Sequence, residues 1–428
     1  MAAKMEGKAM NRKKKITVTV LCSCLGVLLA AGAAAAIVLP VTYAVDRRLI
    51  VKNPDYSVVR ENRDGYTVLM KKDVSGNVLD GDFKVIGFTD THLDHHKEKG
   101  NVTLEYIIRN TVNEKPDLVV FVGDNITSSF NARRAKQLCR VMEELGVYWT
   151  CVLGNHEGDN RWSMSREKMV QLFSSYPHCL MESDVKHTAD GEEVWGNGNH
   201  VICLTDPQGC ITRSLFFFDG GNEMSEADLA QYAAQIEAGT GRKDDYVKPS
   251  QIQWYRETLS ALEGLGTPEN DGHVPSTVFV HIPLPEYKTA YEALTGETEV
   301  SPANAPVCDV PNENGDMLIM GQRREGICCS GHNGGLFDAI LDAGSTDLVV
   351  CGHDHINDFV LRWQGVILSY NVPSGYSSYN LYTKKLSDKM IKGYTRYTFR
   401  GDGSFDLEQL HNADLWPEAQ EEIRKLYD

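Results

Sequence analysis

A regular spacing of cysteines is absent from this chain of 428 residues. Two of the eleven cysteines, Cys22 and Cys24, lie in a long apolar segment. The other nine are an odd number without a repeating interval, which excludes the disulfide framework of small secreted domains. Internal repeats are also absent, and a hydrophobic content of 42% indicates an ordinary globular protein with its own core.

An excess of positive charge is missing as well. The chain has 43 lysines and arginines against 59 aspartates and glutamates, a formal net charge of −16. Residues 1–45 hold six basic residues and one acidic residue, so the rest of the chain carries a net charge of −21. A globule this acidic repels the backbone of DNA or RNA, and we expect no nucleic-acid partner.

Charged residues are missing from the thirty positions between Ile16 and Val45. This stretch is long enough to cross a bilayer and longer than the apolar core of most signal peptides. Residues 1–15 before it are basic, which predicts that this end stays cytoplasmic and that the rest lies outside. We therefore expect 16–45 to be a transmembrane helix that anchors the protein to the membrane. The alternative is cleavage as a signal peptide, which would make the protein secreted.

The remainder of the chain alternates strand-like and helix-like patterns. Residues 46–81 read as a linker and a small hairpin, with turn residues in DVSGNVLDGD. One domain is expected over 82–411, followed by a C-terminal tail at 412–428. Strands are expected at 83–89, 117–122, 147–153, 200–205, 214–219, 277–281 and 347–351, and helices at 102–113, 131–145, 165–174 and 251–262. The alternation predicts parallel βαβ units, whose functional loops lie at the carboxyl ends of the strands.

Five of these strands end in carboxylate, amide or imidazole side chains. The motifs are TDTHLD, GDNIT, GNHEG, HIP and CGHDH, and they carry Asp90 and His92, Asp124, Asn155 and His156, His281, and His353 and His355. A helix cap, a turn residue or a core histidine would explain each motif singly. Five such junctions in one chain favour a common site for metal ions, and cysteine is never the liganding type.

This ordered set resembles the calcineurin-like metallophosphoesterase superfamily over about residues 83–370. The sequences HIPLPEY, GHDHIND, VWGNGNH and QRREG are similar to the purple-acid-phosphatase-like branch of plants and fungi. The resemblance implies an α/β fold, a four-layer sandwich of two β-sheets flanked by helices. It also implies a site for two metal ions at the strand-end edge.

The same resemblance implies a role for each motif residue. The first metal would be held by Asp90, His92, Asp124 and His355, and the second by Asp124, Asn155, His281 and His353. Nitrogen and oxygen ligands suit iron, zinc or manganese, as divalent or mixed-valence ions. A hydroxide that bridges the metals would be the nucleophile, and His156 would be the general acid with Glu157 as its orienting partner.

Two departures from the family pattern concern the metals. Thr127 stands where true purple acid phosphatases have a tyrosine ligand, and His92 is present where they usually lack it. The site is therefore expected to resemble the His-liganded calcineurin type. For the substrate, Arg323 and Asn333 on the long connection before the last helix are candidate binding residues; a surface arginine is the alternative reading of Arg323.

Three functions remain open at this point. The first is a phosphatase that hydrolyses monoesters of a phosphorylated small molecule or a phosphoprotein. The second is a phosphodiesterase or nucleotidase on the same metals. The third is a catalytically inactive binding protein at the cell surface.

Overall fold

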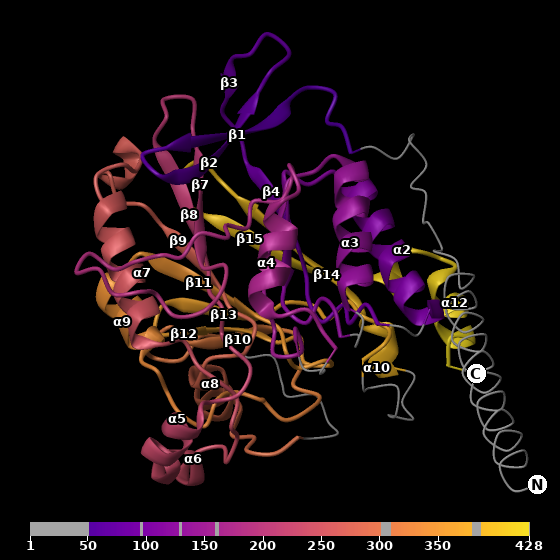
Figure 1. The fold of residues 1–428 in the computed structure, drawn as a ribbon, viewed down its shortest axis with the longest axis vertical. Coiled ribbons are helices and arrows are strands. Elements are labelled where there is room, and N and C mark those ends of the chain that lie inside the picture. The colour runs from indigo at the N-terminus through magenta and orange to yellow at the C-terminus, as the bar shows by residue number, and fades with distance from the viewer. Residues whose placement is uncertain are drawn as a thin grey trace, which may run out of the picture. The chain divides into compact units, whose positions relative to one another are not determined.

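The apolar runs of the sequence form two β-sheets in a computed structural model (Figure 1). The structure describes residues 51–94, 97–127, 131–158, 162–300, 310–378 and 387–427. The expected cytoplasmic segment 1–15 and the expected anchor 16–45 lie outside these residues. In the part of the chain that is described, no helix combines the length and the apolar character needed to span a bilayer.

The five-stranded sheet contains the first three predicted strands, and these are parallel to one another. Its order is β15 (Phe405–His411), β14 (Gly393–Phe399), β4 (Phe83–Phe88), β5 (Leu118–Val122), β6 (Trp149–Val152). Figure 1 shows the helices α2 (Lys97–Glu114), α3 (Asn131–Leu145) and α4 (Arg166–Ser174) together on one side of the molecule. The parallel strands β4, β5 and β6 point their carboxyl ends to the same edge.

The ten-stranded sheet is mixed. Its order is β1 (Ser57–Arg63), β2 (Tyr66–Lys72), β7 (His200–Thr205), β8 (Ile211–Phe217), β9 (Ser276–Phe279), β11 (Thr346–Cys351), β13 (Val366–Tyr370), β12 (Val360–Trp363), β10 (Met317–Met320), with β3 (Val78–Leu79) beside β2. The strands β8, β9, β11 and β13 are parallel neighbours. The region 46–81, expected as linker and hairpin, thus contributes the antiparallel pair β1–β2 to this sheet.

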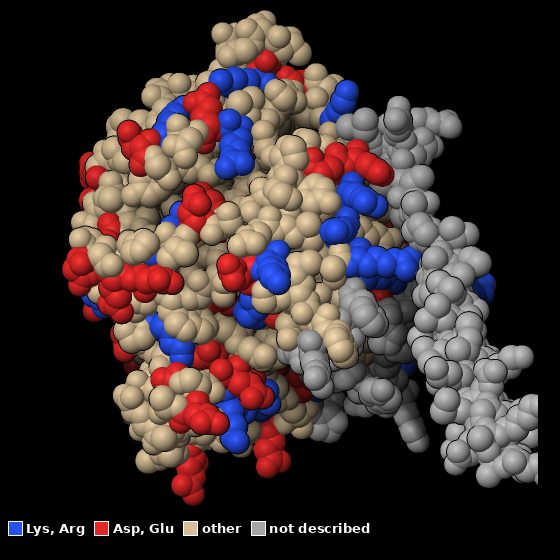
Figure 2. Space-filling view, in the orientation of Figure 1, with Lys and Arg blue, Asp and Glu red and all other residues tan. Residues whose placement is uncertain are grey.

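The remaining helices lie outside the sheets or at their ends. They are α5 (Glu226–Gln231), α6 (Ala233–Ala238), α7 (Pro249–Leu262), α8 (Pro285–Thr295), α9 (Leu336–Ala343), α10 (Ser387–Met390), α11 (Asn412–Leu415) and α12 (Ala419–Lys425), with a 3₁₀ turn at Pro268–Asn270. The expected tail at 412–428 contains α11 and α12. Figure 2 shows that acidic side chains gather where α7 and α9 lie.

The alternation of side chains along the strands divides the core into layers. In β11, Leu348 and Val350 join one cluster that also contains residues of β4 and β5, so this cluster fills the space between the two sheets. Val349 points the other way, into a cluster with Tyr255 of α7 and Phe337 of α9. The predicted mixed α/β fold with two sheets and flanking helices is confirmed.

Candidate metal centre

The five polar motifs meet at one edge of the fold because they follow the carboxyl ends of parallel strands. Asp90 and His92 follow β4, Asp124 follows β5, and Asn155 follows β6. From the other sheet, His281 follows β9, and His353 and His355 follow β11.

The backbone at this edge is unusual. Four of the predicted ligands have positive φ angles: Asp90 (52°), His92 (42°), Asp124 (49°) and His353 (76°). Residues other than glycine rarely adopt this left-handed conformation, and they keep it only where the surroundings enforce it. Backbone bonds between the loops do so, with Asp90 N–H donating to Gly123 O at 3.0 Å and His92 N–H donating to Asp124 O at 2.9 Å.

The first predicted ligand set forms one cluster. One potential ligand atom from each of Asp90, His92, Asp124 and His355 lies within 4.8 Å of the others, and all four residues are buried. The Nε2 atoms of His92 and His355 are 2.9 Å apart. His355 Nε2 is 3.4 Å from Asp90 Oδ1, and His92 Nε2 is 3.7 Å from Asp124 Oδ2. The four side chains therefore converge on one point.

The second predicted set shares Asp124 with the first. Potential ligand atoms of Asp124, His281 and His353 also lie within 4.8 Å of one another. His281 Nε2 is 3.3 Å from Asp124 Oδ2 and 3.2 Å from Asn155 Oδ1, which adds the amide to this group. Asp124 thus lies between two clusters of nitrogen and oxygen donors.

The buried polar atoms of this edge fit two cations. Asp90 Oδ1 and Asp124 Oδ2 are fully buried, and neither accepts a hydrogen bond in the described structure. Such atoms are costly unless a ligand satisfies them. His281 Nδ1–H donates to Val122 O at 2.7 Å, so Nε2 is the nitrogen that faces the cluster. Two carboxylates, an amide and four imidazoles are suitable donors for zinc, iron or manganese.

The shifted pKa values in the cluster also fit the binding of cations. Burial opposes the charge of Asp90, but the nearby imidazoles of His355 and His92 outweigh burial and hold the pKa of this carboxyl well below its usual range. Burial also opposes the charge of His281, yet the carboxylate of Asp124 raises the pKa of this imidazole to about 10. In the metal-free chain a proton on His281 therefore balances negative charge, and a cation would compete with that proton.

A comparison with known families decides the identity. Residues 83–357 match the family model described as calcineurin-like phosphoesterase. The chain belongs to the calcineurin-like phosphoesterase family. It is therefore a hydrolase of phosphoric esters, as the motifs implied.

Relatives of this phosphoesterase include purple-acid-phosphatase-like proteins. The Arabidopsis thaliana protein named "Probable inactive purple acid phosphatase 14" is 28% identical over 332 residues, which are 70% of this chain and 72% of the relative. Phosphatase DCR2 of Saccharomyces cerevisiae is 26% identical over 66% of this chain and 46% of its own length. Among solved structures, a dimetal phosphatase from Danio rerio is 15% identical with a TM-score of 0.46, covering 75% of this chain and 94% of that one.

His156 of this phosphoesterase differs from the ligands in its exposure. Its backbone N–H donates to Asp124 Oδ1 at 2.8 Å, which places the residue beside the shared carboxylate. Its side chain is 42% exposed, and Nε2 lies 3.9 Å from Asp124 Oδ2. This exposure separates His156 from the buried residues of the two clusters.

Glu157 lies against the backbone of the Asp124 loop. Its buried carboxylate accepts hydrogen bonds from backbone N–H groups of the two neighbouring loops, at Gly154 (2.6 Å), Asp124 (3.2 Å), Asn125 (2.5 Å) and Ile126 (3.1 Å). These bonds fix the loop that carries Asp124. Glu157 thus supports the loop of Asp124, and its role as the orienting partner of His156 stays a prediction.

The two predicted substrate-binding residues have hydrogen-bond partners within the chain. The buried guanidinium of Arg323 donates to the backbone carbonyls of Glu297 at 3.0 Å and Thr298 at 3.4 Å, and so fixes the segment after α8. Asn333 donates to Glu286 Oε1 at 2.6 Å and accepts from Gly335 N–H at 2.9 Å, at the start of α9. These contacts give both side chains a structural partner, and their binding of substrate stays a prediction.

A buried network behind the Asn155 loop explains part of the VWGNGNH motif. Arg166 donates to Gly154 O and pairs with Asp219. Asp219 Oδ2 in turn accepts from Asn197 N–H at 2.8 Å. The motif residue Asn197 therefore supports the metal-ligand loop indirectly.

Two residues near the centre were missed in the sequence. Asp244 Oδ1 lies 3.6 Å from His353 Nε2, and Arg242 binds Asp244. Both residues are on the excursion between β8 and α7 and follow no strand, so the strand-end pattern could not identify them.

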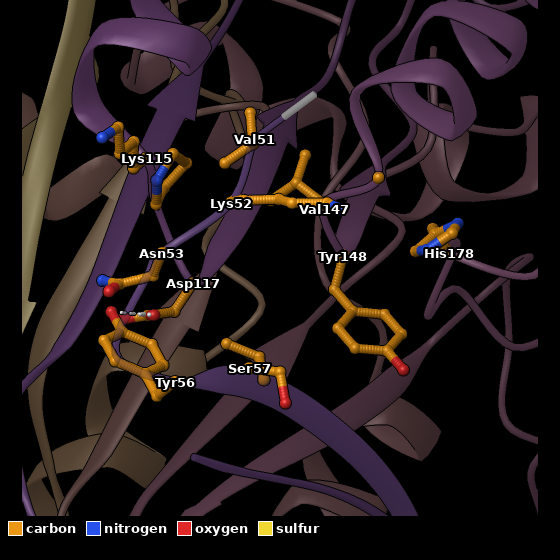
Figure 3. Close-up of a pocket in the computed structure, with 13 residues that line it drawn as sticks. Val51, Lys52, Asn53, Tyr56, Ser57, Lys115, Asp117, Val147, Tyr148 and His178 are labelled. Atoms are coloured by element: carbon orange, nitrogen blue, oxygen red, sulfur yellow. Dashed lines mark hydrogen bonds between the residues drawn. The ribbon is translucent and has the colours of Figure 1, made fainter. Parts of the chain in front are cut away.

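One cavity lies elsewhere, at the amino ends of β5 and β6 (Figure 3). It measures about 430 Å³ and is lined by residues that include Lys52, Tyr56, Lys115, Asp117 and Tyr148. Tyr56 donates to Asp117 Oδ1 at 2.7 Å in this cavity. Since the metal ligands follow the carboxyl ends of the same strands, the cavity is at the opposite edge and is not their substrate pocket.

Proposed function

We propose that the chain is a phosphomonoesterase that depends on two metal ions. The observation that carries this proposal is the position of Asp124, whose carboxylate is shared by two clusters of buried donors. Asp90, His92 and His355 would complete the first site, and Asn155, His281 and His353 the second. The metals would be iron, zinc or manganese, and the substrate a phosphorylated small molecule or a phosphoprotein.

The residues around the centre have separate tasks in this proposal. When bound, the two cations would neutralise the negative charge of the phosphoryl oxygens and would lower the pKa of a water, which serves as the nucleophile. The imidazole of His156 donates a proton to the departing oxygen, because it is the exposed imidazole beside the cluster. Glu157 holds the backbone of the Asp124 loop.

An inactive binding protein is the contrasting function, and the name of the Arabidopsis relative favours it. A protein without selection for metal binding would have no reason to keep a complete donor set. All seven expected metal ligands stand in the sequence, and Asp90 Oδ1 and Asp124 Oδ2 accept no hydrogen bond in the described structure. We therefore favour the enzyme.

The test is hydrolysis by the full chain, purified in detergent and loaded with zinc or manganese. We expect release of nitrophenolate from nitrophenyl phosphate, and slower release from bis-nitrophenyl phosphate. Faster turnover of the diester would assign the chain to phosphodiesterases. No turnover of either ester by a protein that contains two metals per chain would support the inactive binding protein. Asp124→Asn is the matched control, because it removes the shared ligand and should abolish binding of both metals.

We also propose that the enzyme is anchored to a membrane through residues 16–45, with the catalytic domain outside the cytoplasm. The support is the basic segment before a thirty-residue stretch without charge. Protease added to intact cells should remove the domain while a cytoplasmic protein survives. Full protection, in cells whose other surface proteins are cleaved, would contradict this topology.

A further inference from the structure

His353 is the least supported of the predicted ligands. Its side chain is 8% exposed, yet neither Nδ1 nor Nε2 has a hydrogen-bond partner in the described structure. His281, in the same cluster, is fixed by the bond from Nδ1 to the carbonyl of Val122. Metal-bound histidines almost always have such a partner on their second nitrogen, because it sets the tautomer and the ring orientation.

Asp244 is placed to be that partner. Its Oδ1 atom lies 3.6 Å from His353 Nε2, and it is not part of either ligand cluster. Its side chain is 12% exposed. Arg242 holds it with two bonds, from Nε to Oδ2 at 2.5 Å and from Nη2 to Oδ1 at 3.2 Å. These two bonds from the guanidinium of Arg242 orient the carboxylate of Asp244 and balance its negative charge.

The fold keeps Asp244 at this distance. Residues 222–245 leave the ten-stranded sheet after β8, form α5 and α6, and return, with the Asp245 N–H donating to Asn222 O at 3.1 Å. Figure 1 shows α5 and α6 at one end of the molecule. Ser330 Oγ donates to Asp244 O at 2.8 Å. Gly331 touches the carbonyl of Arg242 so closely that any side chain there would collide with it.

We propose that Asp244 is a positioning residue for the second metal site. Asp244 accepts a hydrogen bond from His353 Nε2–H. This bond leaves the lone pair on Nδ1, which would bind the cation shared with Asp124, Asn155 and His281. The excursion that carries α5 and α6 thereby becomes part of the metal centre. This proposal rests on the two-metal centre of the proposed function.

Calorimetric titration of the metal-free full chain with zinc, without substrate, tests the proposal. Wild type should bind two ions. Asp244→Ala should weaken one site by roughly 10- to 100-fold and leave the other unchanged. Asp228→Asn is the matched control, because this carboxylate is on the same excursion but pairs with Lys248 at 2.9 Å, and both sites should keep their affinity.

Two further measurements keep the test decisive if Asp244→Ala folds poorly. Arg242→Gln keeps the carboxylate of Asp244 but removes the guanidinium that orients it, and we expect a several-fold loss of zinc affinity at the same site. Nitrogen NMR of the zinc-loaded wild type should show His353 protonated on Nε2 and bound through Nδ1. Metal on Nε2, or two unchanged sites in Asp244→Ala, would overturn the proposal. A wild-type chain that binds fewer than two ions would overturn the proposed function together with it.

Discussion

Replacing Glu157 by glutamine tests whether the buried carboxylate positions the metal-binding loop. Each oxygen of Glu157 accepts two backbone N–H groups: Oε1 from Asn125 and Ile126, and Oε2 from Gly154 and Asp124. The side-chain amide of glutamine keeps one of the two oxygens and has N–H donors in place of the other oxygen. Two buried backbone donors therefore lose their acceptor and face another donor.

The magnitude follows from two opposing effects. An unsatisfied buried donor costs roughly 1–3 kcal/mol, so two of them would cost about 2–6 kcal/mol. Burial and the nearby charge of Asp124 both raise the pKa of Glu157, which means that its charge is itself unfavourable. Removing that charge offsets part of the loss. We expect the free energy of unfolding to fall by about 2–4 kcal/mol.

The assay combines urea unfolding with zinc titration of Glu157→Gln and of a control. Zinc affinity should fall at least ~10-fold, because the loop that carries Asp124 loses its support. Glu114→Gln is the control, since Glu114 is also buried and accepts from Tyr394 at 2.7 Å but lies at the end of α2. It should lower stability without changing zinc affinity. Equal zinc affinity in Glu157→Gln and wild type would refute the positioning role.

Three more predictions follow from single residues. His156→Ala should lose roughly a hundredfold in kcat/KM on alkyl phosphates, and distinctly less on nitrophenyl phosphate, whose leaving group needs no proton, while metal content stays unchanged. Burial lowers the pKa of His200 from 6.5 to about 4, so the folded chain resists a proton that the unfolded chain accepts. The metal-free protein should thus lose about 3 kcal/mol of unfolding free energy as the pH falls from 6.5 to 4, and urea curves of His200→Gln should lack this step. The iron-loaded protein should show no strong visible band, because Thr127 supplies no phenolate; an intense tyrosinate band would contradict the ligand set.

Much of the strand-and-helix order could be predicted from the sequence because each element has a clear local signal. The helix expected at 131–145 occurs with these bounds, and its apolar residues at helical spacing form its buried face. The short helices α5 and α6 were missed, since this stretch buries little; in α5 no residue is buried. Their position depends on contacts with distant loops rather than on periodicity.

The candidate site also has some residues that could be predicted from the sequence and others that could not. That the candidate ligands lie together could be predicted, because a polar side chain directly after an apolar parallel strand must lie at the common edge. The partners of Arg323, the carbonyls of Glu297 and Thr298, could not be predicted, because they are set by the path of the chain after α8. Asp244 was missed because it meets His353 across 109 positions of sequence, and no local pattern encodes that contact.

The glycines of the motifs explain why the five motifs occur together. A side chain on Gly123 of the GD motif would collide with the ring of His281, and one on Gly154 of the GN motif would collide with Asp124. One on Gly352 of the GH motif would collide with the hydroxyl of Thr89, beside Asp90. At each of these glycines, the loop that carries the glycine thus lies against the loop of another motif. The motifs are one packed unit, and a change in any one of them displaces a ligand that belongs to another.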